Sequence, residues 1–336
     1  VRPRTATGGA ITGVSSRFQY LNGCTEGTTP FQLNADQLAA GTTAPADGIV
    51  CQEDTTKRWQ MYNAATSRKG AAIRGTKRFG DHEIFASFNY YNTKTSNEGV
   101  ARSFTNQTTP GGRQVIPNPI LLPIWVCPQG QLQVSNEPAL GNFTRYTIAT
   151  GCTVTPNGND PLPGAVLNPN NPFAAAGQVA QLSGTSNRSI KTNTNAKTYR
   201  AQMGAHGHFG DGFSYNVGAT ASKVNLDVTN RDYIFLQGLF DAIAQGTYNF
   251  VDQNANSQAA IDQVFPTQTT RKTSKMWQVQ GALRKDLIEL PGGWMNVAVG
   301  AQYRHEELNN PSSNPPNDAN PYARYYTINA VGVKGE

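Results

Sequence analysis

The sequence has no apolar run long enough to cross a membrane as a helix. A transmembrane helix needs about 20 mostly apolar residues, and the 336-residue chain contains no such stretch. The first residues, Val1 to Arg4, also lack the apolar segment of a secretory signal peptide. The protein is therefore either soluble or crosses a membrane with β-strands.

Charged residues are scarce as well, at 15% of the chain, while Gly, Tyr and Phe number 33, 13 and 14. Disordered chains usually combine a high net charge with few aromatic residues, so this composition indicates a folded protein. The net charge is +6, from 28 Lys and Arg against 22 Asp and Glu. Because the basic residues are scattered at alternate positions and do not cluster with aromatic residues, we expect no nucleic-acid partner.

Common enzyme motifs are missing too. The chain has no nucleophile elbow, no glycine-rich phosphate loop, no HExxH and no paired CxxC motif. We therefore expect a protein that is not an enzyme and has no catalytic, cofactor-binding or metal-binding residues. His206 and His208, two positions apart, could share a metal ion, but without an evident third ligand a structural polar role is favoured.

Only four cysteines are present, and they fall as Cys24 with Cys51 and Cys127 with Cys152. Each pair encloses a polar stretch rich in Gly, Pro and Thr, which favours two sequential disulfides formed in an oxidising compartment. Three connectivities are formally possible, and buried free thiols are the alternative. Each closed loop would stabilise the fold by about 3 to 4 kcal/mol through loop-closure entropy.

The strongest pattern is a period-two alternation of apolar and polar residues, which is typical of β-strands. It predicts three hairpins: residues 58–79 with 84–90, 199–209 with 213–221, and 277–287 with 294–306. Their short turns fall at residues 80–82, 210–212 and 290–293, where Gly supplies positive φ at low cost. Flanking strands at residues 10–20 and 322–335 bring the expected total to about eight.

The connections between these hairpins are long, and short and long connections alternate. The expected loops are residues 21–57, 95–197, 227–272 and 307–321, and both cysteine pairs lie within them. Structureless loops in compact domains rarely exceed about 12 to 15 residues. Outer-membrane barrels, in contrast, combine short periplasmic turns with long extracellular loops. Within the third loop, residues 233–245 have near-helical apolar spacing and predict a short helix.

The residue types on the two faces of the expected strands favour a membrane barrel over a soluble sandwich. One face mixes Ala, Val, Met and Ile, with Trp, Tyr and Phe near strand ends, as in aromatic girdles. The other face is polar and partly charged, which a wide lumen filled by water or a polar plug would accommodate. Candidate lumen residues that would contact a ligand or a plug are Arg74, Arg78, Arg200, His206, His208, Arg284 and Arg304.

These arginines could bind an anionic ligand with their fork-shaped donors, or they could hold a plug or pair with neighbouring residues. Aromatic residues of the expected loops, such as Phe173 and Tyr233, could stack on ligand rings or pack the loops onto themselves. The sequence leaves both choices open.

Three segments resemble the barrel of TonB-dependent outer-membrane receptors: residues 168–173 (Asn-Pro-Asn-Asn-Pro-Phe), 199–223 and 289–307. The most specific is a Pro- and Gly-rich turn that leads into Val-Ala-Val-Gly-Ala-Gln-Tyr-Arg at residues 297–304, where the family pattern has Glu at the position of Gln302. The resemblance covers residues 58–92 and 167–308. It implies a barrel of about 22 strands, plugged by an N-terminal domain, that imports a scarce nutrient when TonB pulls on the plug.

The sequence thus predicts an all-β fold in which residues 1–336 form part of one antiparallel transmembrane β-barrel in the bacterial outer membrane. No plug domain or TonB-binding segment is evident, so we expect a longer chain. Expected partners are membrane lipid and lipopolysaccharide, the TonB complex through the plug, and a siderophore, cobalamin or oligosaccharide ligand. Alternatives are a non-transporting outer-membrane protein that serves adhesion or assembly through its disulfide-tied loops, and a soluble extracellular β-protein.

Overall fold

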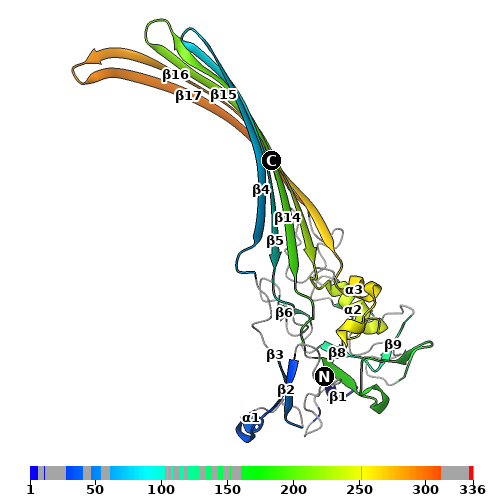
Figure 1. Ribbon diagram of the computed structural model, residues 1–336. Helices are drawn as coiled ribbons and strands as arrows, with labels where there is room; N and C mark the ends of the chain where they lie inside the picture. Colours follow the sequence, from blue (N-terminus) through cyan, green and yellow to red (C-terminus); the bar gives the residue numbers. More distant parts are fainter. Residues whose placement is uncertain are drawn as a thin grey trace.

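In the computed structural model, a long, curved antiparallel β-sheet carries a smaller packed head at one end (Figure 1). The structure describes residues 1–6, 11, 28–40, 47–53, 61–102, 104, 107–108, 114–116, 120–128, 134–137, 143–146, 152, 160–182, 184–250, 252–311 and 333–335. Within these ranges, no helix has the length and apolar character needed to span a membrane.

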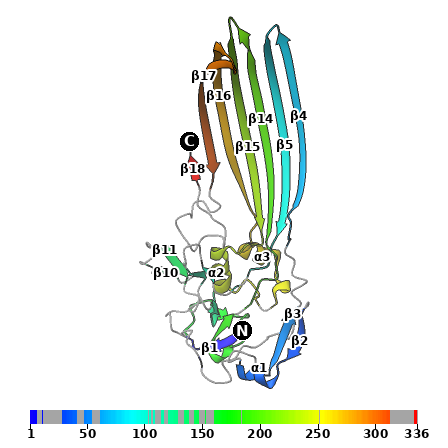
Figure 2. The same ribbon diagram turned by 90° about the vertical axis from the view of Figure 1, so that its left-hand side faces the viewer.

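The sheet has seven strands, in the order β18, β17, β16, β15, β14, β5 and β4. Their bounds are β4 Ala65–Phe79, β5 His82–Glu98, β14 Lys191–Phe209, β15 Phe213–Arg231, β16 Gln268–Leu290, β17 Gly293–Asn310 and β18 Val333–Gly335. All neighbouring pairs are antiparallel, and Figure 2 shows the long strands side by side. The predicted all-β class and the three hairpins are confirmed.

The described strands form an open sheet, with β4 at one edge and β18 at the other, and they do not close into a barrel. Of the two expected flanking strands, residues 10–20 lie outside the described residues except for Ile11. The strand expected at residues 322–335 is described only as Val333–Gly335, which pairs with residues 308–310 of β17. The barrel and its place in a membrane stay predictions.

The three hairpin turns lie at the end of the sheet far from the head (Figure 1). Gly80 and Gly210 adopt φ of +57° and +53°, a left-handed conformation that is costly for a residue with a Cβ. The alternating strands therefore stop where glycine allows the chain to reverse. The turn positions agree with the pattern of the sequence.

The long strands extend further toward the head than predicted. β5 runs to Glu98, β15 runs to Arg231 and β16 begins at Gln268, all within ranges expected as loops. β14 and β17 extend in the same direction, whereas β4 begins at Ala65, later than expected. The alternation of apolar and polar residues with one constant apolar side ends before these ranges, but cross-strand pairing continues through them without a break.

The head is built from three of the expected loops together with the N-terminal strand β1. Its strands are β1 Arg2–Arg4, β2 Thr28–Gln32, β3 Ile49–Glu53, β6 Gln107–Thr108, β7 Gln114–Ile116, β8 Ile120–Leu122, β9 Trp125–Val126, β10 Val134–Glu137, β11 Phe143–Tyr146, β12 Val166–Leu167 and β13 Val179–Leu182. Its helices are α1 Ala35–Ala40, α2 Leu236–Gln245 and α3 Gln258–Val264, with 3-10 turns η4 Ala174–Ala176 and η5 Gln253–Ala255. Helix α2 confirms the helix predicted at residues 233–245.

The core of the head joins segments that are far apart in the sequence. Phe104, Tyr248 and Phe265 are almost fully buried, together with apolar residues of α2 and α3. The ring of Phe104 meets that of Phe250 edge-on at a centroid distance of 5.5 Å, and Tyr248 lies 4.8 Å from Phe250. Such ring pairs stabilise a core beyond the area that they bury. The longest connection is therefore partly a folded unit and not a structureless loop.

A buried asparagine cluster fixes the backbone of the head. The side chains of Asn168, Asn170 and Asn171 are at most 6% exposed. Asn168 Nδ2 and Asn171 Nδ2 donate to the carbonyl oxygen of Pro123, at 2.9 and 3.2 Å, and Asn170 Nδ2 donates to the carbonyl oxygen of Tyr248 at 2.9 Å. Because buried backbone carbonyls need partners, these amides let residues 168–171 pack against two distant segments.

Candidate functional site

Cross-strand pairing assigns the side chains of the sheet to two faces, because directly opposite residues of an antiparallel pair point to the same side. One row runs across the long strands through Arg74, Ser87, Gln202, Thr220, Gln278 and Arg304. Arg74 and Arg304, from the first and last hairpins, thus share a face. We call it the polar face.

All seven candidate lumen residues lie on the polar face. Arg78 and His206 share a row through Glu83, and His208 and Arg284 share the next row through β15. Arg200 lies one row from Arg74, on the head side. The register therefore brings these residues to one side of the sheet, where they are distributed over β4, β14, β16 and β17.

Several of these arginines have carboxylate neighbours on the same face. Arg78 Nε donates to Glu83 Oε2 at 2.7 Å, and Arg284 Nη2 lies 2.9 Å from Asp286 Oδ1. Arg304 also forms an ion pair with a carboxylate two residues along its strand. Exposed ion pairs of this kind contribute at most about 1 kcal/mol each. At these three positions the arginine is paired with a carboxylate of the sheet. Pairing with neighbouring residues was one of the two alternatives that the sequence left open.

His206 and His208 lie on the polar face two positions apart. In the part of the chain that the structure describes, no group of three or more His, Cys, Asp or Glu residues could hold a metal ion. The described residues therefore offer the pair no third ligand.

The opposite face, which we call the apolar face, exposes a broad hydrophobic surface. Ile73, Ile84, Phe88, Met203, Val217, Trp277, Val279, Leu283, Val297, Val299 and Tyr303 lie on it and are 43% to 71% exposed. Soluble monomers rarely expose a contiguous apolar patch of more than a few hundred Å². A face that stays apolar across all six long strands is therefore a candidate surface for contact with lipid or with another protein.

Aromatic rings border the apolar face on its head side. Tyr90 and Tyr199 pair across β5 and β14 with ring centroids 5.2 Å apart. Trp277 and Tyr303 form a second pair on β16 and β17, also at 5.2 Å. Tyr and Trp combine an apolar ring with a polar tip, so they favour the boundary between an apolar phase and water. We call these residues the head-side girdle.

A second aromatic border lies near the turns, where the rings of Phe209 and Phe213 stack 5.4 Å apart. On β14, the apolar band between the two borders runs from Tyr199 to Phe209. At about 3.3 Å per residue this stretch is roughly 33 Å long. A tilted strand of about 9 to 11 residues crosses the hydrocarbon core of a bilayer, so the length of the band matches a bilayer.

Beyond the head-side girdle the two sides of the sheet exchange character. On β15 the side of the apolar face continues with Lys223, Asn225 and Asp227, while the side of the polar face continues with Val224, Leu226 and Val228. The backbone pairing is continuous here, so the change lies in the residue types alone. The same side thus changes from apolar to charged at the level of the tyrosine rings.

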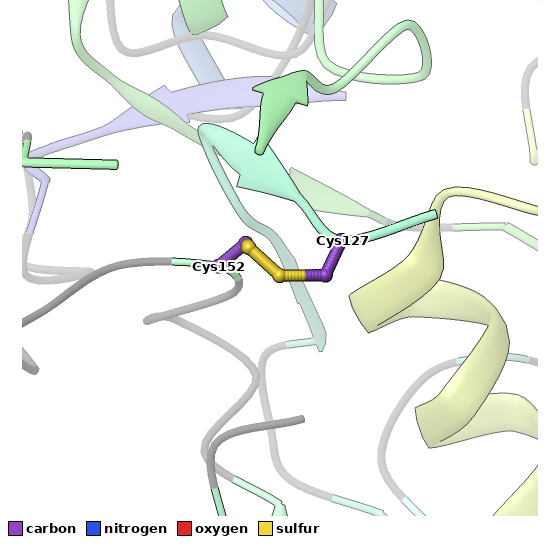
Figure 3. Close-up of a disulfide and its surroundings, with 2 residues drawn as sticks. All are labelled: Cys127 and Cys152. Carbon is purple, nitrogen blue, oxygen red and sulfur yellow. A yellow bond between two sulfur atoms is a disulfide. The ribbon is translucent and has the colours of Figure 1, made fainter. Parts of the chain in front are cut away.

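A disulfide joins Cys127 and Cys152 in the head, with their Cα atoms 5.2 Å apart (Figure 3). The backbone N–H of Cys127 donates to the carbonyl oxygen of Ala244 at 3.0 Å, which places the disulfide beside helix α2. This pairing confirms one of the two sequential disulfides expected. Cys51 is also disulfide-bonded, and its expected partner, Cys24, lies outside the described residues.

The two loop aromatics considered as ligand contacts are engaged inside the head. Phe173 packs against the buried core. The hydroxyl group of Tyr233 lies 3.1 Å from Thr192 Oγ1, and the guanidinium of Arg102 lies 6.0 Å from the centre of the Tyr233 ring. Their contacts support the alternative that these side chains pack the loops.

Several lysines gather on the charged continuation of the apolar face, beyond the head-side girdle. These residues were not predicted from the sequence. They are Lys69, Lys94, Lys197 and Lys223. Continuing the period-two count past Tyr90 and Tyr199 would have placed them together.

No known family model matches the chain, and neither a curated protein nor a solved structure matches it. The two faces of the sheet are therefore the main evidence for what the protein does.

Proposed function

We propose that the sheet is part of the wall of a β-barrel in the bacterial outer membrane. The observation that carries this proposal is the exposed apolar face, which lies between two aromatic borders and gives way to charged residues beyond one of them. A bilayer would cover a face of this length, and the polar face would line the lumen. Within lipid, all backbone groups of a sheet must be paired, so further strands would pair with the two edges.

We further propose that this barrel is a TonB-dependent receptor that takes up a scarce nutrient of the siderophore, cobalamin or oligosaccharide class. The resemblance of residues 168–173 and 289–307 to such receptors supports this proposal, as does the concentration of arginines on the polar face. The short turns and the packed head lie at opposite ends of the sheet, as expected for periplasmic turns and extracellular loops. The TonB complex would act through a plug domain.

In this proposal, the head captures the nutrient outside the cell and the polar face lines its route inward. Arg200 and Arg74 occupy successive depths from the head toward the turns, whereas Arg78, which is nearer the turns, is paired with Glu83. Guanidinium groups bind carboxylates and phosphates through two parallel hydrogen bonds, so these depths would offer contacts to an anionic ligand or to acidic residues of a plug. Movement of the plug would open the route.

A second candidate is a non-transporting outer-membrane protein that serves adhesion or assembly. The aromatic core and the Cys127–Cys152 disulfide favour it, because they give the head a fixed shape of its own. The intact mass of the native polypeptide, purified in detergent from outer membranes, separates the two candidates. A mass of roughly two to three times 36.2 kDa would support a plugged receptor of about 22 strands. A mass near 36.2 kDa would overturn transport and favour adhesion.

The membrane position itself is tested by a matched pair of substitutions. Val279 lies in the middle of the apolar face and is 45% exposed, while the next residue, Gln280, lies on the polar face. Arginine near the bilayer midplane on the lipid side costs about 2 to 4 kcal/mol, whereas lumen positions tolerate charge. Val279→Arg should therefore reduce the free energy of unfolding from phosphatidylcholine bilayers by that amount, and Gln280→Arg should leave it near the wild-type value.

Denaturant titration of the full-length native protein in vesicles measures both free energies. Similar values for the two variants would contradict the assignment of the apolar face to lipid. Extraction of the native protein into buffer without detergent would also contradict it and would favour the soluble alternative.

A further inference from the structure

Four lysines from four neighbouring strands lie on the continuation of the apolar face, just beyond the head-side girdle. Lys69 and Lys197 belong to one cross-strand row. Lys223 is directly opposite Tyr199 and so lies at the level of the girdle, while Lys94 lies one row nearer the head. We call Lys69, Lys94, Lys197 and Lys223 the lysine collar.

The lysine collar has cationic groups that the described part of the chain does not pair with carboxylates. Among the described residues, no carboxylate lies within 4.0 Å of the side-chain nitrogen of Lys69, Lys94 or Lys223. Two other cations of this surface are already paired: Lys275 with Glu307 at 2.7 Å and Arg271 with Asp227 at 2.6 Å. The surface therefore keeps an excess of positive charge that an anionic ligand would complement.

A groove of about 610 Å³ adjoins the lysine collar next to the head. The side chains that line it from this side of the sheet are Ala65, Ser67, Lys94, Ser96, Asn193, Asn195, Asp227 and Thr229. Hydroxyl and amide groups both donate and accept hydrogen bonds, as sugar hydroxyls do. The surface thus joins cations, which suit phosphate, to a groove that suits a sugar.

The two ends of the apolar face differ in how their lysines are used. Near the turns, the ammonium group of Lys77 lies 4.9 Å from the centre of the Phe79 ring, and that of Lys285 lies 4.1 Å from the Phe213 ring. Those cations rest on aromatic rings, whereas the lysine collar lies beside a groove that presents hydroxyl and amide groups. A ligand with phosphates and sugars is therefore expected on the head side alone.

We infer that the lysine collar and its groove bind the phosphorylated sugar headgroup of an outer-leaflet glycolipid of the lipopolysaccharide type. This inference rests on the proposed function, which places the lysine collar at the level of the outer headgroups. Lysines near a membrane surface attract anionic lipids. The lysines hold the phosphates, the groove holds the sugar, and the acyl chains lie along the apolar face.

The test compares the full-length native protein with the triple variant Lys69→Gln/Lys94→Gln/Lys197→Gln in lipid nanodiscs. Lys272→Gln is the matched control, because Lys272 lies at a similar height on β16 but on the side of the polar face. The probes are diphosphorylated lipid A and the same lipid after removal of its phosphates. The wild type and the control should bind phosphorylated lipid A more tightly than the dephosphorylated lipid. The triple variant should bind phosphorylated lipid A about 100-fold more weakly than the wild type does.

Equal binding of phosphorylated lipid A by all three proteins would overturn the inference. So would equal binding of the two lipid forms by wild type, or displacement of the lipid by millimolar inorganic phosphate, which would indicate a site for free anions. Failure of the proposed function has a separate signature, since Val279→Arg and Gln280→Arg would then fold equally well. If Val279→Arg alone is destabilised and no preference for phosphorylated lipid is found, only the glycolipid site is wrong.

Discussion

Trp277 and Tyr303 lie side by side on β16 and β17, with ring centroids 5.2 Å apart, where the apolar face meets the charged part of the sheet. The exposed fraction of Trp277 is 44% and that of Tyr303 is 58%, so neither ring is buried in a protein core. Amphipathic rings at this place would lie at the headgroup level of a bilayer. Trp277 is therefore a probe of the proposed membrane boundary.

A variant that keeps Trp277 as its only tryptophan, with the others changed to Phe, should be quenched by brominated lipids in vesicles. We expect stronger quenching from lipids brominated near the headgroup than from lipids brominated at the chain end, because the girdle borders the apolar band. A variant that keeps only Trp125, a half-buried residue of the head, is the control and should be quenched by neither lipid. Equal quenching of the two variants would contradict the boundary.

The long strands could be predicted because each keeps one residue type on each side over many positions. From Tyr199 to Phe209, for example, apolar or small residues alternate with polar ones, and the glycines at Gly210 and Gly212 end the pattern. Beyond Lys223 the two sides exchange residue types while the backbone pairing continues. A prediction that keeps the apolar residues on one constant side therefore ends these strands too early.

The sequence predicts which residues lie on the polar face, but it does not predict which of them are neighbours across the strands. Period two puts Arg74 and Arg304 on the polar side of their strands, but only the register across four intervening strands places them in one row. The head was harder, because its core depends on contacts between segments distant in sequence, such as Phe104 with Phe265. No periodicity in the local sequence identifies residues that make such long-range contacts.

The buried asparagine cluster predicts a large effect of one substitution in the head. Asn171 is 4% exposed, and its Nδ2 atom donates hydrogen bonds to the backbone carbonyl oxygens of Leu122, Pro123 and Gln178. Asn171→Ala leaves those acceptors without this donor in a buried place, which should lower the free energy of unfolding of the head by about 2 to 3 kcal/mol. Urea titration followed by near-ultraviolet circular dichroism measures this change.

The matched control for Asn171→Ala is Asn254→Ala. Asn254 is exposed, and its Oδ1 accepts one hydrogen bond, from Asn187. Its loss should cost less than about 1 kcal/mol. A similar cost for both variants would mean that the asparagine cluster does not hold the head together.

The Cys127–Cys152 disulfide should stabilise the head through the loop that it closes. The two residues are 25 positions apart, and cross-linking a loop of this length corresponds to about 3 to 4 kcal/mol by chain entropy. The double variant Cys127→Ser/Cys152→Ser should lose that amount in urea titration, and chemical reduction of the wild type should lower its stability at least as much. An unchanged midpoint in the double variant would show that the asparagine cluster and the aromatic core suffice without the cross-link.

Tyr248 predicts how the head responds to alkaline pH. Burial raises the pKa of Tyr248 from 10.0 to about 12, because the phenolate would be desolvated among apolar residues. Above about pH 10 the unfolded chain loses this proton while the folded head keeps it, so the unfolded state binds fewer protons and stability falls as the pH rises. A pKa difference of about two units between the folded and unfolded states corresponds to a loss of at most about 3 kcal/mol in the free energy of unfolding.

The free energy of unfolding of the head, measured at about pH 9 and about pH 11, should therefore fall more steeply with pH in the wild type than in Tyr248→Phe. Phe keeps the ring contacts with Phe104 and Phe250 but has no proton to lose. Within the described residues, the Tyr248 hydroxyl gives up one long hydrogen bond, 3.4 Å to Gln253 Oε1, so the variant should fold. Tyr62→Phe, at a residue 98% exposed, is the control and should keep the wild-type slope. Equal slopes for wild type and Tyr248→Phe would show that water reaches the phenol, and the aromatic core would then be more open than its packing indicates.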